Sequence, residues 1–254
     1  MIKTEVDPGD FLKREFTDLE RKNLPFATIQ AVNATAFETR EEWKRRIPRV
    51  FDRPTSLTLN AVLYTKATPQ KLSADVFIRD EAFKGNPPAR YLQAQVAGGS
   101  RSMKSFERRL QAAGQLPAGM FAVPGRGLKL DSFGNVPKGV VTAVLSALRS
   151  QNDPYQNVTE TSTKRRRAAR RKRGGEYFSL KSQRGKLRAG VYERIKTGFG
   201  VAVRSVFIYV NKVNYSPRYD IFGMAERIYG RLFPFNFERE LLKAIETSKY
   251  RGRK

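Results

Sequence analysis

The spacing between apolar residues changes along this chain, and that change constrains the fold more than any other feature of the sequence. In PFATIQAVNATAFETREEWKRRI, which starts at residue 25, the apolar residues recur at helical intervals. The pattern predicts a helix within residues 8–51 that buries one face, and Pro48, Asp52, Arg53 and Pro54 are expected to end it. The residues of that face are Ile29, Val32, Ala36, Trp43 and Ile47.

The next stretch alternates between apolar and polar residues, which is the period of a β-strand. SLTLNAVLY and SADVFIR both show this alternation, and TKATPQK separates them. The pattern predicts an antiparallel hairpin. Its inward-facing residues are expected to be Leu57, Leu59, Ala61 and Leu63 in the first strand and Ala74, Val76 and Ile78 in the second.

The middle of the chain returns to helical patterns. Residues 89–116 predict two short helices hinged at Gly98 and Gly99. Pro87 and Pro88 are placed to start the first helix, and Ser100 or Ser102 could cap the second. Residues 119–130 are expected to be extended, and residues 137–151 predict another helix, with Val140, Val144 and Leu148 on one face.

The last third begins with a polar and then strongly basic segment, residues 152–175, which we expect to be a mobile loop. EYFSL, AGVYERI and VAVRSVFIYVNKV then predict three strands. Residues 218–248 predict helix, with Pro234 splitting it. The expected helical face comprises Phe222, Ala225, Ile228 and Leu232 before the proline and Phe237, Leu241 and Ile245 after it.

Together these elements predict an α+β fold in which an antiparallel sheet is flanked by N-terminal and C-terminal helices. A helical insertion and a long basic loop interrupt the strands. The chain has 254 residues, which is enough to bury a substantial core. We therefore expect a single domain over 1–254, with the helical insertion at 85–151 and the basic loop at 152–175.

The basic loop contains KRRRAARRKR, and the charge of the whole chain is also strongly positive, at +25. Such a charge favours negatively charged partners, and a cationic run of this kind could neutralise several phosphates. The run has no aromatic residue for base stacking, so contact with phosphates and docking on an acidic protein both stay open. The expected contact residues are Lys164, Arg165, Arg166, Arg167, Arg170, Arg171, Lys172 and Arg173.

The chain has neither Cys nor His, which excludes disulfides, thiolate zinc sites and His-dependent hydrolytic triads. The apolar stretch 139–148 is too short to span a bilayer, and Arg204 interrupts 201–210. MIKTEVDPGDF has no apolar signal core. We expect a soluble protein that is not exported, with no membrane partner, no metal and no cofactor.

A metal-dependent nuclease is the enzyme class that a basic, His-free chain could most easily belong to. The residues closest to that pattern are Asp75, Asp80, Glu81 and Lys84. Surface counter-charge explains these acids better, because only 24 acidic residues are spread through the chain. GRGLKL and GKLRAG lack the context of a phosphate-binding loop and are expected to be turns. We therefore expect no catalytic residues.

Two stretches resemble structural proteins of tailed bacteriophages. ARYLQAQVAGGSRSMKSFERRLQAAGQL (89–116) resembles a segment found in such proteins. GKLRAGVYERI and the following sequence to residue 247 are similar to the minor tail protein Z and tail-completion group, whose pattern is K-L-R-x-G-[VI]-Y-x-R, a strand, a Y-x-x-R-[YF] turn and an amphipathic helix. The matching residues are Lys186, Leu187, Arg188, Gly190, Val191, Tyr192, Arg194, Tyr215, Arg218 and Tyr219.

The resemblance covers about half of the chain, chiefly 85–116 and 185–247, and this chain departs from the family by its larger middle section and its basic loop. It implies a non-enzymatic virion protein that is assembled in the host cytoplasm and forms a ring at the head–tail junction. The implied partners are further copies, a portal or adaptor, a tail tube or terminator protein, and packaged DNA.

The aromatic residues of the last helix are too many for one narrow face, which core packing or a subunit interface could explain. The residues assigned to a subunit interface are Tyr192, Tyr215, Tyr219, Phe222, Tyr229 and Phe233. A cellular basic protein that binds RNA or DNA is the alternative function, and the nuclease is the weaker one.

Overall fold

The computed structural model describes residues 3–6, 18–83, 85–159, 161–162, 176–197 and 199–251. The chain forms two compact units: the first comprises residues 1–99 and 215–254, and the second comprises residues 100–214. The chain passes between them at two short strands, β4 (Gly99–Ser100) and β9 (Asn214–Tyr215), which pair with each other. Among the described residues, no helix is long and apolar enough to cross a bilayer.

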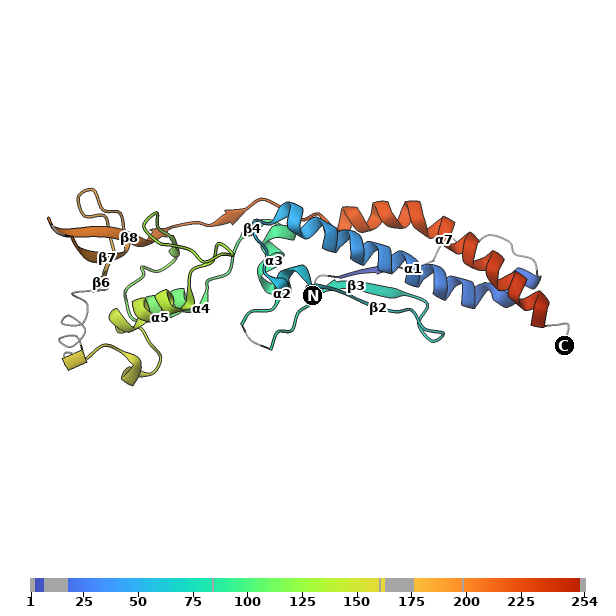
Figure 1. The fold of residues 1–254 in the computed structure, drawn as a ribbon, viewed down its shortest axis with the longest axis horizontal. Helices are drawn as coiled ribbons and strands as arrows, with labels where there is room; N and C mark the ends of the chain where they lie inside the picture. Colours follow the sequence, from blue (N-terminus) through green and yellow to red (C-terminus); the bar gives the residue numbers. More distant parts are fainter. Residues whose placement is uncertain are drawn as a thin grey trace. The chain divides into compact units, whose positions relative to one another are not determined.

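The first unit is built from two long helices and a three-stranded antiparallel sheet. Helices α1 (Asp18–Val50) and α7 (Ile221–Arg251) pack along each other, and the sheet lies beside α1 (Figure 1). The strand order is β1-β3-β2, and the short helices α2 and α3 complete the unit. The remaining bounds are β1 Lys3–Val6, α2 Ser56–Leu59, β2 Val62–Thr65, β3 Ala74–Ile78 and α3 Pro88–Val96.

The predicted face of the N-terminal helix is confirmed. Val32, Ala36, Trp43 and Ile47 are fully buried in the core of the first unit, and Ile29 packs against it. Burying a large apolar side chain of this kind stabilises the fold by roughly 1.5–3 kcal/mol. The helix continues through Pro48 to Val50, so the expectation that Pro48 ends it is wrong, whereas Asp52, Arg53 and Pro54 do follow its end.

Two buried polar contacts, one from Tyr219 just before α7 and one from Asn236 within it, fix the alignment of α1 and α7. The Tyr219 hydroxyl donates to the backbone oxygen of Trp43 at 2.9 Å, and the Asn236 side-chain amide donates to the Thr35 hydroxyl at 3.1 Å. Burial raises the pKa of the Tyr219 hydroxyl far above its ordinary value, so this group stays a donor. A slide of one helix along the other would leave these polar groups buried without partners, which is costly.

The C-terminal helix is continuous, so the expected split at Pro234 is wrong. Pro234 lies inside α7, where a proline removes one backbone hydrogen bond and its ring crowds the backbone carbonyl of the residue four positions earlier. Phe233 and Phe237 are buried on either side of the proline, and this packing outweighs the lost hydrogen bond. Of the predicted face, Ala225 and Ile228 are buried, whereas Phe222 is 51% exposed.

The predicted hairpin is confirmed in its second strand and shifted in its first. β2 and β3 pair antiparallel, and Ala74, Val76 and Ile78 are buried. Residues 56–59 form the short helix α2 instead of strand, because the Thr55 hydroxyl accepts from the Thr58 backbone N–H and caps a helical turn. Leu57 and Leu59, which were expected to face inward from the first strand, therefore lie in α2, and the strand itself begins only at Val62.

The second unit has a four-stranded antiparallel sheet in the order β5-β8-β7-β6, with helices α4 and α5 packed against it (Figure 1). The predicted α+β class is confirmed, but the strands are divided between separate sheets where the sequence suggested one. The bounds are α4 Ser105–Ala112, β5 Phe121–Pro124, α5 Lys138–Ala147, the 3-10 turn η2 Pro154–Gln156, β6 Glu176–Leu180, β7 Gly190–Thr197 and β8 Gly200–Val210.

The two units have separate hydrophobic cores that share no described residue. The second unit also starts and ends later than the expected insertion at 85–151, since α3 belongs to the first unit. Compactness does not say whether the units unfold together, so the single domain stays a prediction.

A buried carboxylate organises the start of the second unit. Glu107 is fully buried and accepts from the backbone N–H groups of Lys104 (2.6 Å) and Ala122 (2.8 Å) and from the Arg101 guanidinium (2.5 and 2.8 Å). It therefore caps α4 and ties that helix to β5. The expected caps Ser100 and Ser102 are wrong, because α4 begins only at Ser105 and Glu107 reaches back to the residue before it.

Glu107 makes the stability of the second unit sensitive to acid. Burial alone would raise the pKa of Glu107, but Arg101 and the two backbone donors outweigh it, so the pKa lies below its ordinary value of 4.5. This stabilisation is complete above pH 4.5 and is lost as the pH falls through the lowered folded-state value. We expect Glu107→Gln to lower the free energy of unfolding at neutral pH by about 3 kcal/mol, since Arg101 loses its charge partner.

Urea denaturation between pH 3 and pH 7 measures both effects. Glu176→Gln is the matched control, because its ion pair with Arg194 (3.7 Å) is about half exposed and should contribute less than about 1 kcal/mol. Equal losses for the two variants would contradict the role given to Glu107.

Candidate polyanion-binding surface

The predicted contact run, residues 164–173, lies outside the described residues, so the structure assigns it no geometry. The described chain reaches Ser162 before it and resumes with β6 at Glu176. The run therefore belongs to the connection between η2 and β6 in the second unit. Its eight expected contact residues stay a prediction.

The six aromatic residues assigned to a subunit interface are divided between the two units, and within the first unit the rings of Tyr229 and Phe233 stack with their centres 5.0 Å apart. Tyr192 belongs to the second unit and the other five belong to the first. Tyr192, Tyr219 and Phe233 are buried within the chain, Tyr215 and Tyr229 are partly buried, and Phe222 is about half exposed. Core packing therefore accounts for the three buried rings.

Several residues of the phage-like pattern have packing roles in the second unit. A side chain at Gly190 would place its Cβ 2.3 Å from the backbone oxygen of Phe207 on the neighbouring strand β8, so only glycine fits. The Tyr192 hydroxyl donates to the backbone oxygen of Arg188 at 2.8 Å. The pattern thus describes how β7 starts and packs.

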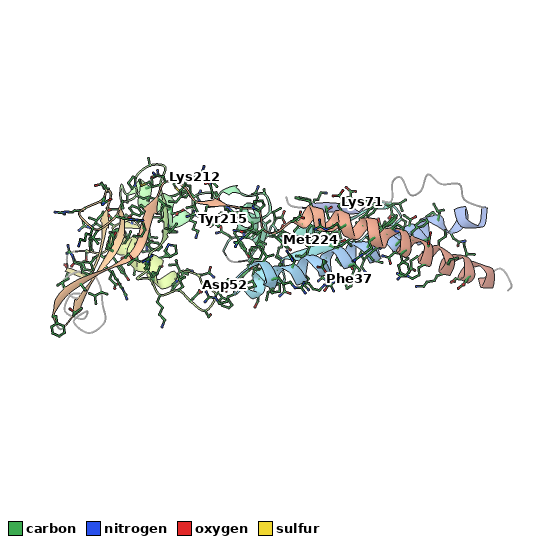
Figure 2. The ribbon with its side chains drawn as sticks, turned by 90° about the horizontal axis from the view of Figure 1, so that it is seen from above. Phe37, Asp52, Lys71, Lys212, Tyr215 and Met224 are labelled. Carbon is green, nitrogen blue, oxygen red and sulfur yellow. The ribbon has the colours of Figure 1, made fainter. Side chains whose placement is uncertain are left out.

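Of the residues weighed for a nuclease, Asp75 acts as a counter-charge, Asp80 and Glu81 are exposed, and Lys84 lies outside the described residues. Asp75 pairs with Lys71 at 2.9 Å and with Lys3 at 3.4 Å (Lys71 is labelled in Figure 2). Burial would raise the pKa of Asp75, but the two lysines hold it below its ordinary value. Within the described part of the chain, no three Asp or Glu side chains gather as a metal site would require.

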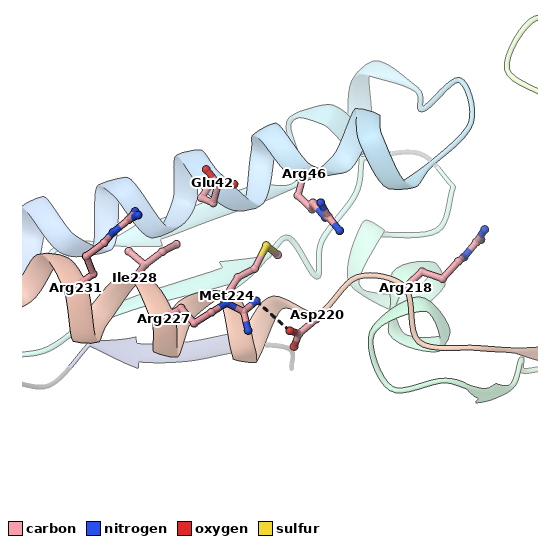
Figure 3. Close-up of a pocket in the computed structure, with 8 residues that line it drawn as sticks. All are labelled: Glu42, Arg46, Arg218, Asp220, Met224, Arg227, Ile228 and Arg231. Atoms are coloured by element: carbon pink, nitrogen blue, oxygen red, sulfur yellow. Dashed lines mark hydrogen bonds and ion pairs between the residues drawn. The ribbon is translucent and has the colours of Figure 1, made fainter.

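The structure instead reveals an arginine-lined concavity of about 560 Å³ in the first unit, between α1 and the start of α7 (Figure 3). Met224 and Ile228 form its apolar floor and are more than nine-tenths buried. Its polar lining comprises Arg46, Arg218, Arg227, Arg231, Glu42 and Asp220.

Local hydrogen bonds fix one end of this concavity. The Asp220 carboxylate accepts from the Gly223 backbone N–H at 2.9 Å, which caps α7, and from Arg227 at 3.3 Å (dashed in Figure 3). Arg218 donates to the Gln95 side-chain oxygen at 2.9 and 3.1 Å. Two arginines are therefore held by α3 and by the cap of α7.

Two further arginines keep their charge available. The guanidinium groups of Arg46 on α1 and Arg231 on α7 have no hydrogen-bond or ion-pair partner among the described residues. Four arginines and two acids leave the concavity positively charged, so it can hold an anion. In the sequence, the signal for this set is the four-residue spacing of Arg227 and Arg231, which puts both on one face of a predicted helix.

Comparisons with known proteins give no independent guide to function. No protein-family model matches the chain, and neither a curated protein nor a solved structure matches it. The phage resemblance therefore stays a prediction.

The cap of α7 predicts a contrast between two variants of Asp220. Asp220→Ala removes the acceptor for the Gly223 N–H and should lower the free energy of unfolding by about 1 kcal/mol. Asp220→Asn keeps an oxygen acceptor for the Gly223 N–H, so its free energy of unfolding should fall by much less. Urea denaturation measures both, and an equal loss would mean that the charge, not the cap, stabilises the helix.

Proposed function

We propose that this chain is a non-enzymatic structural protein of a tailed-phage particle that forms a ring at the head–tail junction. Three features support the proposal: the phage-like pattern, the charge of +25, and the surface of α7. The observation that carries it is that α7 has large apolar side chains outside its core face.

The outer surface of α7 is unusually apolar for a helix that already packs on one side. Phe222, Phe235 and Leu242 are 51%, 62% and 62% exposed. Phe235 and Leu242 are seven positions apart and so lie on the same stripe of the helix. The guanidinium of Arg239 lies 5.7 Å from the centre of the Phe235 ring. Exposed aromatic residues beside arginine are typical of protein interfaces.

The proposed occupant of this stripe is a neighbouring copy of the same chain, in the head-to-tail contact that closes a ring. Because each copy carries a large positive charge, copies repel each other at low salt. Packaged DNA or acidic neighbouring proteins would neutralise that charge. The basic run 164–173 would then aid assembly by contacting DNA or an acidic neighbour.

The main alternative is a cellular nucleic-acid-binding protein, which the net charge alone also supports. The two functions differ in what the isolated monomer does. A dedicated nucleic-acid binder should bind tightly as a monomer, whereas a ring subunit should bind weakly and gain affinity when many copies act together.

The stripe on α7 predicts self-association that depends on apolar contact. Phe235→Ser with Leu242→Ser should abolish the oligomer seen by sedimentation velocity at high salt, where charge repulsion is screened. The folded state should persist, because both side chains are exposed. Phe83→Ser is the matched control, since Phe83 is fully exposed elsewhere in the first unit. A wild-type chain that stays monomeric under all conditions overturns the ring.

The basic run leads to separate predictions for DNA binding by the isolated chain and for the presence of the chain in phage particles. Deleting residues 164–173 should reduce DNA binding in a filter assay across a salt series, and the isolated monomer should bind weakly even with the run present. Mass spectrometry of purified phage particles should find the chain. Tight monomer binding that the deletion abolishes, together with absence from particles, supports the cellular alternative.

A further inference from the structure

A second concavity, of about 550 Å³, lies in the second unit between α4, which lines it along its length from Ser105, and residues 149–152, which follow the end of α5. Its lining contains three arginines, Arg108, Arg109 and Arg149. Neutral polar residues, among them Ser105, Gln151 and Asn152, complete the polar part of the lining. Among the described residues that line it there is no acid. This distinguishes it from the concavity in the first unit, where Asp220 and Glu42 offset part of the charge.

Arg149 occupies a backbone position that favours glycine. It follows the last residues of α5, and its φ is +55°, in the left-handed region. The Arg149 N–H donates to the Ser146 oxygen at 3.2 Å, and the Ser150 N–H donates to the Leu145 oxygen at 2.7 Å. This is the hydrogen-bonding arrangement in which helices usually end on glycine. The arginine here costs stability relative to glycine, and its side chain lines the concavity.

Arg109 is held in place only by neutral groups. Its guanidinium donates to the Gln151 side-chain oxygen at 3.3 Å and lies 3.5 Å from the Ser105 hydroxyl. Its Nε atom is buried and has no hydrogen-bond partner within the described chain. The charge of Arg109 is therefore positioned without being neutralised.

Arg108 and Arg149 are exposed, and their guanidinium groups have no hydrogen-bond or ion-pair partner in the described part of the chain. The C-terminal ends of α4 and α5 contribute a partial negative charge of about half a unit each. Three guanidinium groups exceed that by a wide margin. The concavity is consequently a preformed site for more than one negative charge.

We propose that this concavity binds phosphate groups of a nucleic-acid backbone. Arginine, serine, asparagine and glutamine side chains are the groups that contact phosphates in such complexes, and nucleic-acid interfaces are polar and positively charged. An acidic protein segment fits less well, because protein interfaces centre on apolar and aromatic side chains. Among the described residues that line the concavity, Ala112 and Ala113 are the only apolar ones, and there is no aromatic side chain.

This phosphate site goes beyond the proposed function, in which residues 164–173 contact DNA or an acidic neighbour. It stands on the geometry of the second unit and not on the phage resemblance. Self-association through α7 and incorporation into particles test the ring independently, so either idea can fail while the other holds.

The test measures binding of the full-length chain to a fluorescein-labelled 20-base-pair duplex by fluorescence anisotropy across a salt series. Each lost phosphate contact should reduce the slope of log K against log salt by about 0.9 and weaken binding roughly five- to tenfold at 0.1 M salt. We expect this for Arg108→Gln and for Arg149→Gly, and about twice the slope change for the double variant. Arg184→Gln is the charge-matched control, since Arg184 is exposed in the same unit and outside the concavity.

Arg149 provides a second readout that a merely structural role would not produce. Arg149→Gly relieves the left-handed backbone, so its melting temperature should rise by roughly 2–4 °C while its DNA affinity falls. Arg149→Lys keeps the charge and should retain most of the salt slope. Slopes for Arg108→Gln and Arg149→Gly that equal that of Arg184→Gln overturn the site. A poly-glutamate probe that loses affinity as strongly as the duplex overturns the assignment to phosphate.

Discussion

The packing of α1 against α7 is the contact on which the first unit depends. It joins segments that are far apart in the sequence, and the bonds from Tyr219 to Trp43 and from Asn236 to Thr35 fix how the two helices align. The entropy lost in closing so long a loop must be regained by burial along the whole seam, which Trp43, Phe233 and Phe237 supply. The same alignment brings Arg46 of α1 and Arg231 of α7 to one concavity. Core packing and the cationic surface are thus products of a single helix pairing.

The second unit depends in a similar way on one buried charge. Glu107 satisfies two backbone N–H groups and Arg101, so its burial costs little and α4 is held against β5. Acids elsewhere also neutralise nearby cations, as Asp75 does for Lys71 and Glu193 for Arg204. Because the chain has 49 basic and only 24 acidic residues, many arginines remain without such a partner. Arg108 and Arg149 are among them, and both line the same positively charged concavity in the second unit.

The basic character could be predicted from composition, but its arrangement could not. The run 164–173 is contiguous, so the sequence shows it directly. Arg149 and Arg108 are separated by a strand and a helix, and nothing in their spacing indicates that they meet. Likewise the aromatic excess of the last helix was visible in the sequence, yet the division into buried Phe233 and Phe237 and exposed Phe222 and Phe235 depends on how α7 is rotated against α1.

The sequence by itself determined the local elements: the helical face of α1, the alternation in β3, the three late strands and the helices on either side of Gly98 and Gly99. These follow from periodicity and from glycine and proline, whose effects extend over only a few residues. Only the tertiary structure decided that α7 continues through Pro234, that the strands form separate sheets and that the arginines gather in concavities. Each of these outcomes is set by contacts between residues distant in the chain, because long-range burial and polar pairing outweigh local preference.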